Sequence, residues 1–477
     1  MNAQPSAAAA ALAAAALLSA CSLAPKYEKP AVQDVPAYKE AGQWMPAQPA
    51  DAGPRGSWWE AFGDPKLNEL QQQLRDGSLD LRAAVARFEQ ARAVARRARS
   101  DVFPTVDAHA SATRARGSAN APASDGTIAT GNDFIAGANL SWEIDLFGRL
   151  RNAAKAAGNR AQASAADLAA VDLALRAELA SDYFSLRGSD AELKLLEDTV
   201  KAYDRAYDLT SNRYQGGIAA ATDVDQAETQ RQNARAQLAA IRLQRAQLEH
   251  AIAVLLGQPP AAFTLETAAF VGEPPPIATG LPSALLLRRP DVAGAERAVA
   301  AANAEVGVAR AAWFPVFVLG GSAGYEGTTS SSWFEAPSRF WSAGPAAQVP
   351  LLDFGARSAI NRQAAAAYEE AVANYRQAAL TAYREVEDNL AALRHLADEV
   401  TADEAAAASA QRSAYHADRR YAAGVADYLE VASTQTAALQ AQRSALEARV
   451  QRLNAAVGLV RALGGGWTSD QLEHPVL

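Results

Sequence analysis

Five histidines and one cysteine are the side chains with which this chain of 477 residues could perform nucleophilic or metal chemistry. The histidines are scattered, at His109, His250, His395, His416 and His474, and neither an HExxH zinc motif nor a GxSxG nucleophile elbow occurs. We interpret His416 as a solvated residue on a helix face rather than a metal ligand. The sequence therefore predicts no enzyme, no metal site and no cofactor.

The cysteine, Cys21, ends the sequence LLSAC and follows an apolar stretch from Ala7 to Ala20. This arrangement resembles the lipobox of bacterial lipoproteins, in which the signal peptide is cut before the cysteine and the thiol receives a diacylglycerol. We expect residues 1–20 to be a signal peptide and Cys21 to carry the lipid, with a free thiol as the alternative. Ser22 replaces the aspartate that retains such lipoproteins in the inner membrane, so the resemblance indicates the outer membrane.

Composition excludes several classes of partner. The chain is 49% apolar with much alanine, which favours long helices over a compact core. Its formal charge is -8 and its arginines are interspersed with acidic residues, so no basic stripe marks a nucleic-acid interface. No run after residue 20 reaches the roughly 18 apolar residues of a membrane-spanning helix, so we expect any membrane crossing to use strands. Because no Lys or Arg precedes Ala7, we also expect the natural start codon further upstream.

The chain repeats its own pattern after about 207 residues. RYQGGIAAATDV starts at Arg213 and returns as RYAAGVADYLEV at Arg420. A helical pattern that ends in VFP at Pro104 returns as one that ends in WFP at Pro315, and each proline ends its helix because it lacks a backbone donor. Each half then has alternating segments, a glycine in DLFGR or LDFGAR, and a very long helical pattern.

The alternating segments predict four strands with one apolar and one polar face. In the clearest segment, one face holds Phe134, Ala136, Ala138, Leu140, Trp142, Ile144 and Leu146. Four strands cannot close a transmembrane barrel, since the smallest bacterial barrels have about eight. Copies must therefore share one barrel, and we expect three copies because about eight strands would leave an interior filled by side chains. A sheet packed on a domain core is the alternative.

Heptad spacing in the long helical patterns predicts four antiparallel coiled-coil arms. An arm of about 65 residues would reach roughly 100 Å. Gly217 and Gly424 fall where each outgoing helix must reverse, and glycine tolerates the left-handed backbone of a helix C-cap. We expect Thr222 to cap the first returning helix, with Asp223 as the alternative, and Asp427 to cap the second.

Together these features resemble the TolC-like outer-membrane efflux proteins, in the lipoprotein subgroup that serves tripartite RND-type pumps. The resemblance covers nearly the whole mature chain and rests on the order and spacing of several motifs. They are WWEAFGDPKLNEL from Trp58, SWEIDLFGRLRN from Ser141, RYQGGIAAATDV from Arg213, LPSALLLRRPDVAGAE from Leu281, ARAAWFP from Ala309 and RYAAGVADYLEVASTQ from Arg420.

The resemblance implies an α+β membrane protein in which three chains form a 12-stranded outer-membrane β-barrel, continued by a 12-helix periplasmic α-barrel with a mixed equatorial domain. It implies a lipid-anchored exit duct that passively conducts small molecules such as drugs. The implied partners are two further copies, outer-membrane lipid, a periplasmic adaptor and an inner-membrane RND-type pump.

The expected segments follow from these elements. They are 1–20 (signal peptide), 21–78 (lipid anchor and equatorial segment), 79–102 (helix), 103–148 (first β-hairpin), 149–256 (first coiled-coil hairpin), 257–290 (equatorial segment), 291–313 (helix), 314–354 (second β-hairpin), 355–462 (second coiled-coil hairpin) and 463–477 (equatorial tail).

The resemblance also implies a gate near the hairpin tips. Asp223 would pair with Tyr421, while Leu429 and Glu430 would line the constriction. Ser433 stands where the family commonly has aspartate, so a charge ring would rest on Glu430 alone. The residues expected to dock the adaptor are Arg213, Gly217, Arg420 and Gly424.

Two other functions share some of these features. A coiled-coil spacer lipoprotein without a lumen would have the anchor and the heptads, but it would not need two alternating hairpins. A duct for a secreted protein or for metal ions would share the whole architecture. We also expect a negative lumen at the strands, from Asp107, Asp133, Glu143 and Asp145.

Overall fold

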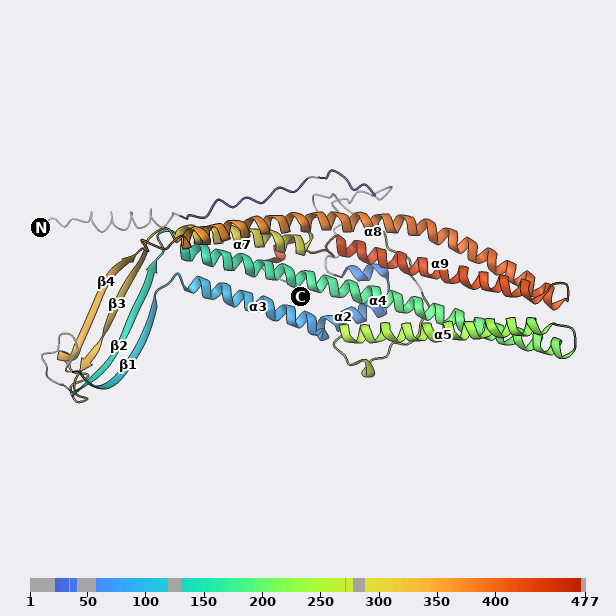
Figure 1. Ribbon diagram of the computed structural model, residues 1–477, viewed down its shortest axis with the longest axis horizontal. Helices are drawn as coiled ribbons and strands as arrows, with labels where there is room; N and C mark the ends of the chain where they lie inside the picture. Colours follow the sequence, from blue (N-terminus) through green and yellow to red (C-terminus); the bar gives the residue numbers. More distant parts are fainter. Residues whose placement is uncertain are drawn as a thin grey trace. The chain divides into compact units, whose positions relative to one another are not determined.

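A computed structural model of the chain describes residues 22–33, 35–40, 57–118, 130–270, 272–277 and 288–472 (Figure 1). Cys21 and the expected signal peptide lie outside these residues. The chain forms two compact units. The first combines Met1–Ala31, Phe88–Ser164 and Ala295–Tyr375, and the second combines the rest of the chain.

The first unit contains a four-stranded sheet, seen side by side in Figure 1. Its strands are β1 (Thr105–Arg116), β2 (Thr130–Ile144), β3 (Val316–Gly327) and β4 (Arg339–Gln348). All three pairings are antiparallel, in the order β1-β2-β3-β4. The sheet therefore joins the two halves of the chain through β2 and β3, and β1 and β4 form its edges.

The register confirms the two-faced character of the strands. Ala108, Ala138, Ala323 and Trp341 stand opposite one another across the sheet and therefore share one face. The neighbouring row is Asp107, Asn139, Ser322 and Ser342, in which the two serine hydroxyls hydrogen-bond at 2.7 Å. One face of the sheet is thus apolar, and the other carries polar side chains that pair with each other.

Helices α3 (Leu79–Ser100) and α7 (Pro290–Ala311) precede the two hairpins. Each ends a few residues before its proline, through turns in which the amides of Phe103 and Phe314 donate to carbonyls three residues back. In the first unit the segment around Pro25 lies against α7, where the side-chain amide of Asn303 donates to the carbonyl of Pro25.

Four long helices follow the strands, and their outgoing members are much longer than the returning ones. They are α4 (Arg149–Gln215), α5 (Ala221–Leu255), α8 (Ala356–Ala422) and α9 (Tyr428–Ala462). The predicted seam of α4 is buried at Leu196, Tyr203 and Thr210, which are seven residues apart. Leu196 packs with Ile241 of α5 and Leu439 of α9, so three helices meet along this seam.

Close helix contacts depend on small residues. A methyl group built on Gly188 of α4 would lie 2.4 Å from Cγ2 of Val450 on α9, so the two helices meet at a position that only glycine fits. None of the helices in the described part of the chain has an apolar stretch long enough to cross a bilayer.

Short elements complete the second unit. They are η1 (Trp58–Phe62), α2 (Pro65–Gly77), η2 (Pro260–Ala262) and η4 (Ser469–Leu472), while η3 (Ala336–Ser338) lies between β3 and β4 of the first unit. Asp64 caps α2 by accepting hydrogen bonds from the amides of Lys66 and Leu67.

Candidate functional site

The two hairpin tips, α4 to α5 and α8 to α9, have the same backbone conformation. Gly217 and Gly424 have φ values of 74° and 76°, in the left-handed region that the sequence predicts. In both tips the residue after the glycine donates its amide to a carbonyl five residues back, from Ile218 to Arg213 and from Val425 to Arg420. The glycine amide itself closes the shorter inner bond. Both outgoing helices thus end in a Schellman motif.

The returning helices are capped differently from one another. Asp427 is the N-cap of α9 and accepts the amide of Glu430 at 3.0 Å, as predicted. The expectation that Thr222 caps α5 is wrong. Ala220 occupies the N-cap position, and its amide donates to the carboxylate of Asp223 at 3.2 Å. Alanine has no side-chain acceptor, so α5 has only the reverse half of a capping box, in which the third residue of the helix accepts the amide of the N-cap residue.

A buried aromatic cluster lies just behind the tips and joins the two hairpins. It contains Ala227, Ala417, Tyr421, Tyr428, Val431 and Ala432. The rings of Tyr421 and Tyr428 meet edge to face with centroids 5.6 Å apart. Burial raises the pKa of Tyr428 to about 12, so its phenol stays protonated even in alkaline solution.

Within the described chain, Tyr421 has Thr210 as its side-chain partner rather than the expected Asp223. Its hydroxyl lies 3.0 Å from Oγ1 of Thr210, and both side chains are buried. A buried hydroxyl requires a partner, and Thr210 of α4 supplies it beside the cluster. Asp223 remains at the helix end, engaged with the amide of Ala220.

Arg213 links the two tips, although the sequence suggested only an adaptor-docking role. Its guanidinium donates to the carbonyls of Tyr421 and Ala422 at 3.0 and 3.2 Å, and it lies 4.4 Å from the centroid of the Tyr421 ring. These carbonyls belong to the last turn of α8, where a cation is favoured. Arg213 therefore fastens the end of the second outgoing helix to the first hairpin.

The equivalent residue of the second tip makes a different contact. Arg420 forms an ion pair with Glu430 at 2.7 Å within its own hairpin. The carboxylate expected to form a charge ring alone thus has a cationic partner. Leu429 beside it is 58% exposed, and the hydroxyl of Ser433 donates to the carbonyl of Glu430.

Gln230 adds a further link between the hairpins that the sequence analysis missed. Its side-chain oxygen accepts from the Tyr428 hydroxyl at 3.1 Å, and its nitrogen donates to the carbonyl of Ala432 at 2.7 Å. No spacing rule identifies such a residue, because its partners lie about 200 residues away in the sequence.

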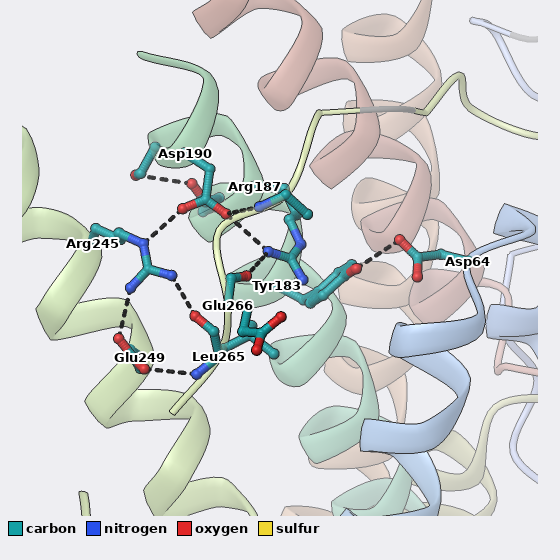
Figure 2. Close-up of polar contacts among 11 residues, drawn as sticks. Asp64, Tyr183, Arg187, Asp190, Arg245, Glu249, Leu265 and Glu266 are labelled. Carbon is teal, nitrogen blue, oxygen red and sulfur yellow. Dashed lines mark hydrogen bonds and ion pairs between the residues drawn. The ribbon is translucent and has the colours of Figure 1, made fainter. Parts of the chain in front are cut away.

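A second network missed by the sequence analysis fixes the segment that follows the first hairpin (Figure 2). Arg245 of α5 donates to Asp190 of α4 at 2.6 Å, to Glu249 at 2.7 Å and to the carbonyl of Leu265 at 2.5 Å. Glu249 also accepts the amide of Leu265. Arg245 is the residue that interrupts the apolar heptad seam of α5, and this network explains the interruption.

Arg187 completes the network on the other side of Asp190. It donates to Asp190 at 2.8 Å and to the carbonyl of Glu266 at 2.7 Å, and its guanidinium lies 4.9 Å from the centroid of the Tyr183 ring. The Tyr183 hydroxyl in turn donates to Asp64, the cap of α2 (Figure 2). Asp190 is buried between two arginines, so its charge is compensated.

The comparisons with known proteins agree with this architecture. A family profile described as outer membrane efflux protein matches residues 70–258 and 281–465, one stretch in each half. The chain belongs to the outer membrane efflux protein family. The probable efflux pump outer membrane protein TtgC of Pseudomonas putida is 32% identical over 454 residues, which cover 94% of each chain.

Two further members of the outer membrane efflux family extend the comparison. The pyoverdine export outer membrane protein OpmQ of Pseudomonas aeruginosa is 33% identical over 436 residues, covering 90% of this chain and 92% of OpmQ. The crystal structure of the CmeC outer membrane channel of Campylobacter jejuni matches with a TM-score of 0.89 at 25% identity, covering 94% and 96% of the two chains.

Family membership confirms the predicted family, fold class and general function. The protein is an outer-membrane efflux component, a transport duct and not an enzyme. Its fold is the α+β arrangement of a four-stranded sheet and long helical hairpins.

Proposed function

We propose that three copies of this efflux protein form one channel, the exit duct of a tripartite pump. The observation that carries the proposal is the four-stranded sheet, in which β1 and β4 each have one neighbour within the described chain. Backbone groups at an open sheet edge find no partner in lipid, and each unpaired group costs several kcal/mol. Edge β4 of one copy must therefore pair with edge β1 of the next.

Three copies fit this pairing better than two. Pairing of β4 with β1 joins two different surfaces, so the interface is head-to-tail and must close into a ring. About eight strands would leave an interior filled by side chains, whereas about twelve leave a lumen. The apolar face of the sheet would then meet lipid, and the polar face would line the lumen.

We further propose that the hairpin tips meet a periplasmic adaptor, which connects the duct to an inner-membrane RND-type pump. The name of the relative TtgC describes one component of an efflux pump, which supports the presence of further components. At the tips Gly217 and Gly424 are exposed, and Ile218 and Val425 beside them expose apolar side chains to solvent. The name of OpmQ specifies pyoverdine export, which favours small molecules over a secreted protein as cargo.

The same tips would close the duct at rest. In a ring of three copies, Leu429 would supply an apolar constriction that resists wetting, and Glu430 would add a ring of charges, each paired with Arg420. We expect Glu430→Ala to raise single-channel conductance and antibiotic leakage. Glu404→Ala removes an exposed ion pair with Arg449 elsewhere in the same hairpin and should change neither quantity. Unchanged conductance and leakage in Glu430→Ala would exclude Glu430 as the gate.

The lipid anchor is a separate proposal, which rests on the sequence LLSAC. Radiolabelled palmitate should be incorporated into the wild-type protein and not into a Cys21→Ala variant. Equal labelling of the two would show that Cys21 is not the acylated residue.

The decisive experiment measures assembly and conduction on one sample. The purified full-length protein in detergent should have the mass of three chains by light scattering. The same sample should give small, mostly closed conductance steps in planar bilayers. A monomer would overturn the shared barrel, and a trimer without conductance would overturn the proposed twelve-stranded lumen.

A further inference from the structure

A stacked aromatic contact joins the two halves of the chain where the strands meet the long helices. Phe147, just before the glycine that precedes α4, stacks on Phe314, just before the proline that precedes β3. The ring centroids are 4.5 Å apart and the planes are inclined by 28°. This contact joins the strand-to-helix turn of the first half to the helix-to-strand turn of the second half.

Each of these two rings has an equivalent in the other half of the chain, and the equivalents make no such ring contact with the described residues. Phe354 precedes Gly355 as Phe147 precedes Gly148, and Phe103 precedes its proline as Phe314 does. Phe354 is 100% exposed and Phe103 is 64% exposed. Phe147 and Phe314 are thus packed together, whereas their repeat equivalents Phe354 and Phe103 are exposed to solvent.

The backbone at Phe354 is strained as well as exposed. Its φ of 48° makes it the one non-glycine residue with a positive φ in the described chain. Such a conformation costs roughly 1–2 kcal/mol in an L-residue and persists only where surrounding contacts hold it. The carboxylate of Asp353 holds this turn by accepting the amides of Gly355 and Arg357, but the Phe354 ring itself is fully exposed in the described chain.

A strand pair next to the two rings shows the same difference between a packed pair and its exposed equivalents. Ile144 of β2 stands opposite Phe317 of β3. The equivalent of Ile144 is Leu351, four residues before the second glycine, and the equivalent of Phe317 is Val106, two residues after the first proline. Leu351 is 85% exposed and Val106 is 65% exposed.

Pairing β4 of one copy with β1 of the next in this register would also place the apolar faces of both strands on the same side of the sheet. Val106 lies on the apolar face, opposite Leu140. Leu351 lies beyond the end of β4 at Gln348, an even number of residues after Trp341, so extension of β4 in the ring would place it on the apolar face. A register shifted by one residue would instead place polar side chains of β1 against lipid.

We propose that the seam between adjacent copies repeats the seam between the two halves of one chain. Phe354 of one copy stacks on Phe103 of the next, and Leu351 stands opposite Val106 of that copy. The occupant of the exposed patch is therefore a second copy of this chain. Lipid contact alone would leave the backbone groups of both edges unpaired. This inference rests on the proposed ring assembly and adds its residue-level register.

Cysteine cross-linking tests the register with an internal calibration. The double variant Phe147→Cys/Phe314→Cys places thiols at the contact within one chain, and the double variant Phe103→Cys/Phe354→Cys places them at the proposed contact between copies. Both are treated in membranes with bis-thiosulfonate reagents of increasing length. The reagent length that cross-links positions 147 and 314 within one chain should also cross-link positions 103 and 354 between copies.

The two variants should give different products on a non-reducing gel. The first stays at the mass of one chain, while most of the second moves to a closed product of three chains. Phe103→Cys alone, Phe354→Cys alone and the parent chain with Cys21 should give no product beyond two chains. A trimeric mass by light scattering without the three-chain product would overturn the register and leave the ring assembly standing. A monomeric mass would overturn both.

Thermal dissociation gives a second readout that needs no cross-link. Phe103→Ala and Phe354→Ala should each lower the temperature at which the assembly dissociates. The double variant should dissociate at the same temperature as the less stable of the two single variants, and not at a lower one. Both changes remove the same contact, so the second change has nothing further to remove. Strictly additive lowering would show that the two rings do not meet.

Discussion

At the scale of single residues, Asp182 of α4 has the most informative titration. Burial raises the pKa of its carboxyl from 3.8 to about 6, and the charge of Glu178 adds to the effect. Between these pH values the folded protein binds more protons than the unfolded chain. Stability from this group is therefore highest below pH 3.8, falls as the pH rises to about 6, and stays reduced above it.

We expect Asp182→Asn to stabilise the protein at pH 8 and to have little effect near pH 4. The pKa shift corresponds to an upper limit of about 3 kcal/mol, which partial solvent exposure reduces to about 1–2 kcal/mol. Thermal unfolding of both proteins at the two pH values measures the difference. Asp198→Asn is the matched control, because Lys194 and Lys201 lower the pKa of Asp198, so its loss should not stabilise. An equal gain at both pH values would exclude titration of Asp182 as the cause.

Arg213 should stabilise the hairpin tips more than Arg420, its equivalent in the second half of the chain. Arg213→Ala removes two hydrogen bonds to the end of α8, and we expect a local loss of about 1–3 kcal/mol. Hydrogen exchange of the amides of residues 423–431 should then accelerate about tenfold or more. Arg420→Ala removes only an exposed ion pair, worth about 0–1 kcal/mol, and should accelerate exchange much less. The opposite order would contradict the linking role of Arg213.

Residue types predicted the backbone of the tips better than their side-chain contacts. Gly217 and Gly424 were identifiable because a reversal in a left-handed conformation admits few residues other than glycine. The partner of Tyr421 was not identifiable, because Thr210 and Asp223 lie on the same hairpin and only burial of the phenol selects the threonine. The gate and docking residues therefore remain proposals.

At the scale of elements, the crossing of α4 and α9 depends on one glycine. Gly188→Ala would place a methyl group 2.4 Å from Cγ2 of Val450, and overpacking of this kind costs about 1–3 kcal/mol. Val450→Ala should restore much of the loss by removing the obstructing methyl groups. Thermal unfolding of the two single variants and the double variant measures the coupling. Purely additive destabilisation would show that the two residues do not meet.

The elements themselves followed closely from periodicity. Alternation with period two predicted strands, and heptad spacing predicted the long helices, because burial on one face imposes those periods. The break at Arg245 had no explanation in the sequence. Its reason is tertiary, since Asp190, Glu249 and the carbonyl of Leu265 converge on that guanidinium.

At the scale of the whole molecule, the acidic residues at the sheet contribute less negative charge to the proposed lumen than their number suggests. Glu143 makes two hydrogen bonds to Arg149, at 2.9 and 2.6 Å, and Asp145 is paired with Arg151. Two of the four carboxylates expected to make the lumen negative are therefore neutralised by neighbouring arginines. Asp107 and Asp133 remain as the exposed pair on the polar face.

We expect a weak preference for cations that depends on these two residues. Asp107→Asn/Asp133→Asn should lower the reversal potential in a KCl gradient, whereas the charge-neutral double variant Glu143→Gln/Arg149→Gln should leave it unchanged. The preference should vanish near 1 M salt, where screening acts within about 3 Å. An unchanged potential in the first variant would place the selectivity elsewhere in the duct.

The proposed number of copies follows from a count of strands, but that count does not identify the residues in contact between copies. Alternation shows which side of a strand is apolar, whereas the register between two strands needs an observed pairing. The pairing of Ile144 with Phe317 supplies it within the chain.

The open edges β1 and β4 also have a consequence for how quickly the duct can form. Half of the seams in the proposed ring exist as soon as one chain has folded, at a rate independent of protein concentration. The other half form only when copies collide, so their rate rises with the number of copies per membrane area. An acylated Cys21 would confine the copies to a surface before their strands insert, which raises the local concentration of complementary edges. Under this view the lipid acts mainly during assembly, and the finished ring depends little on it.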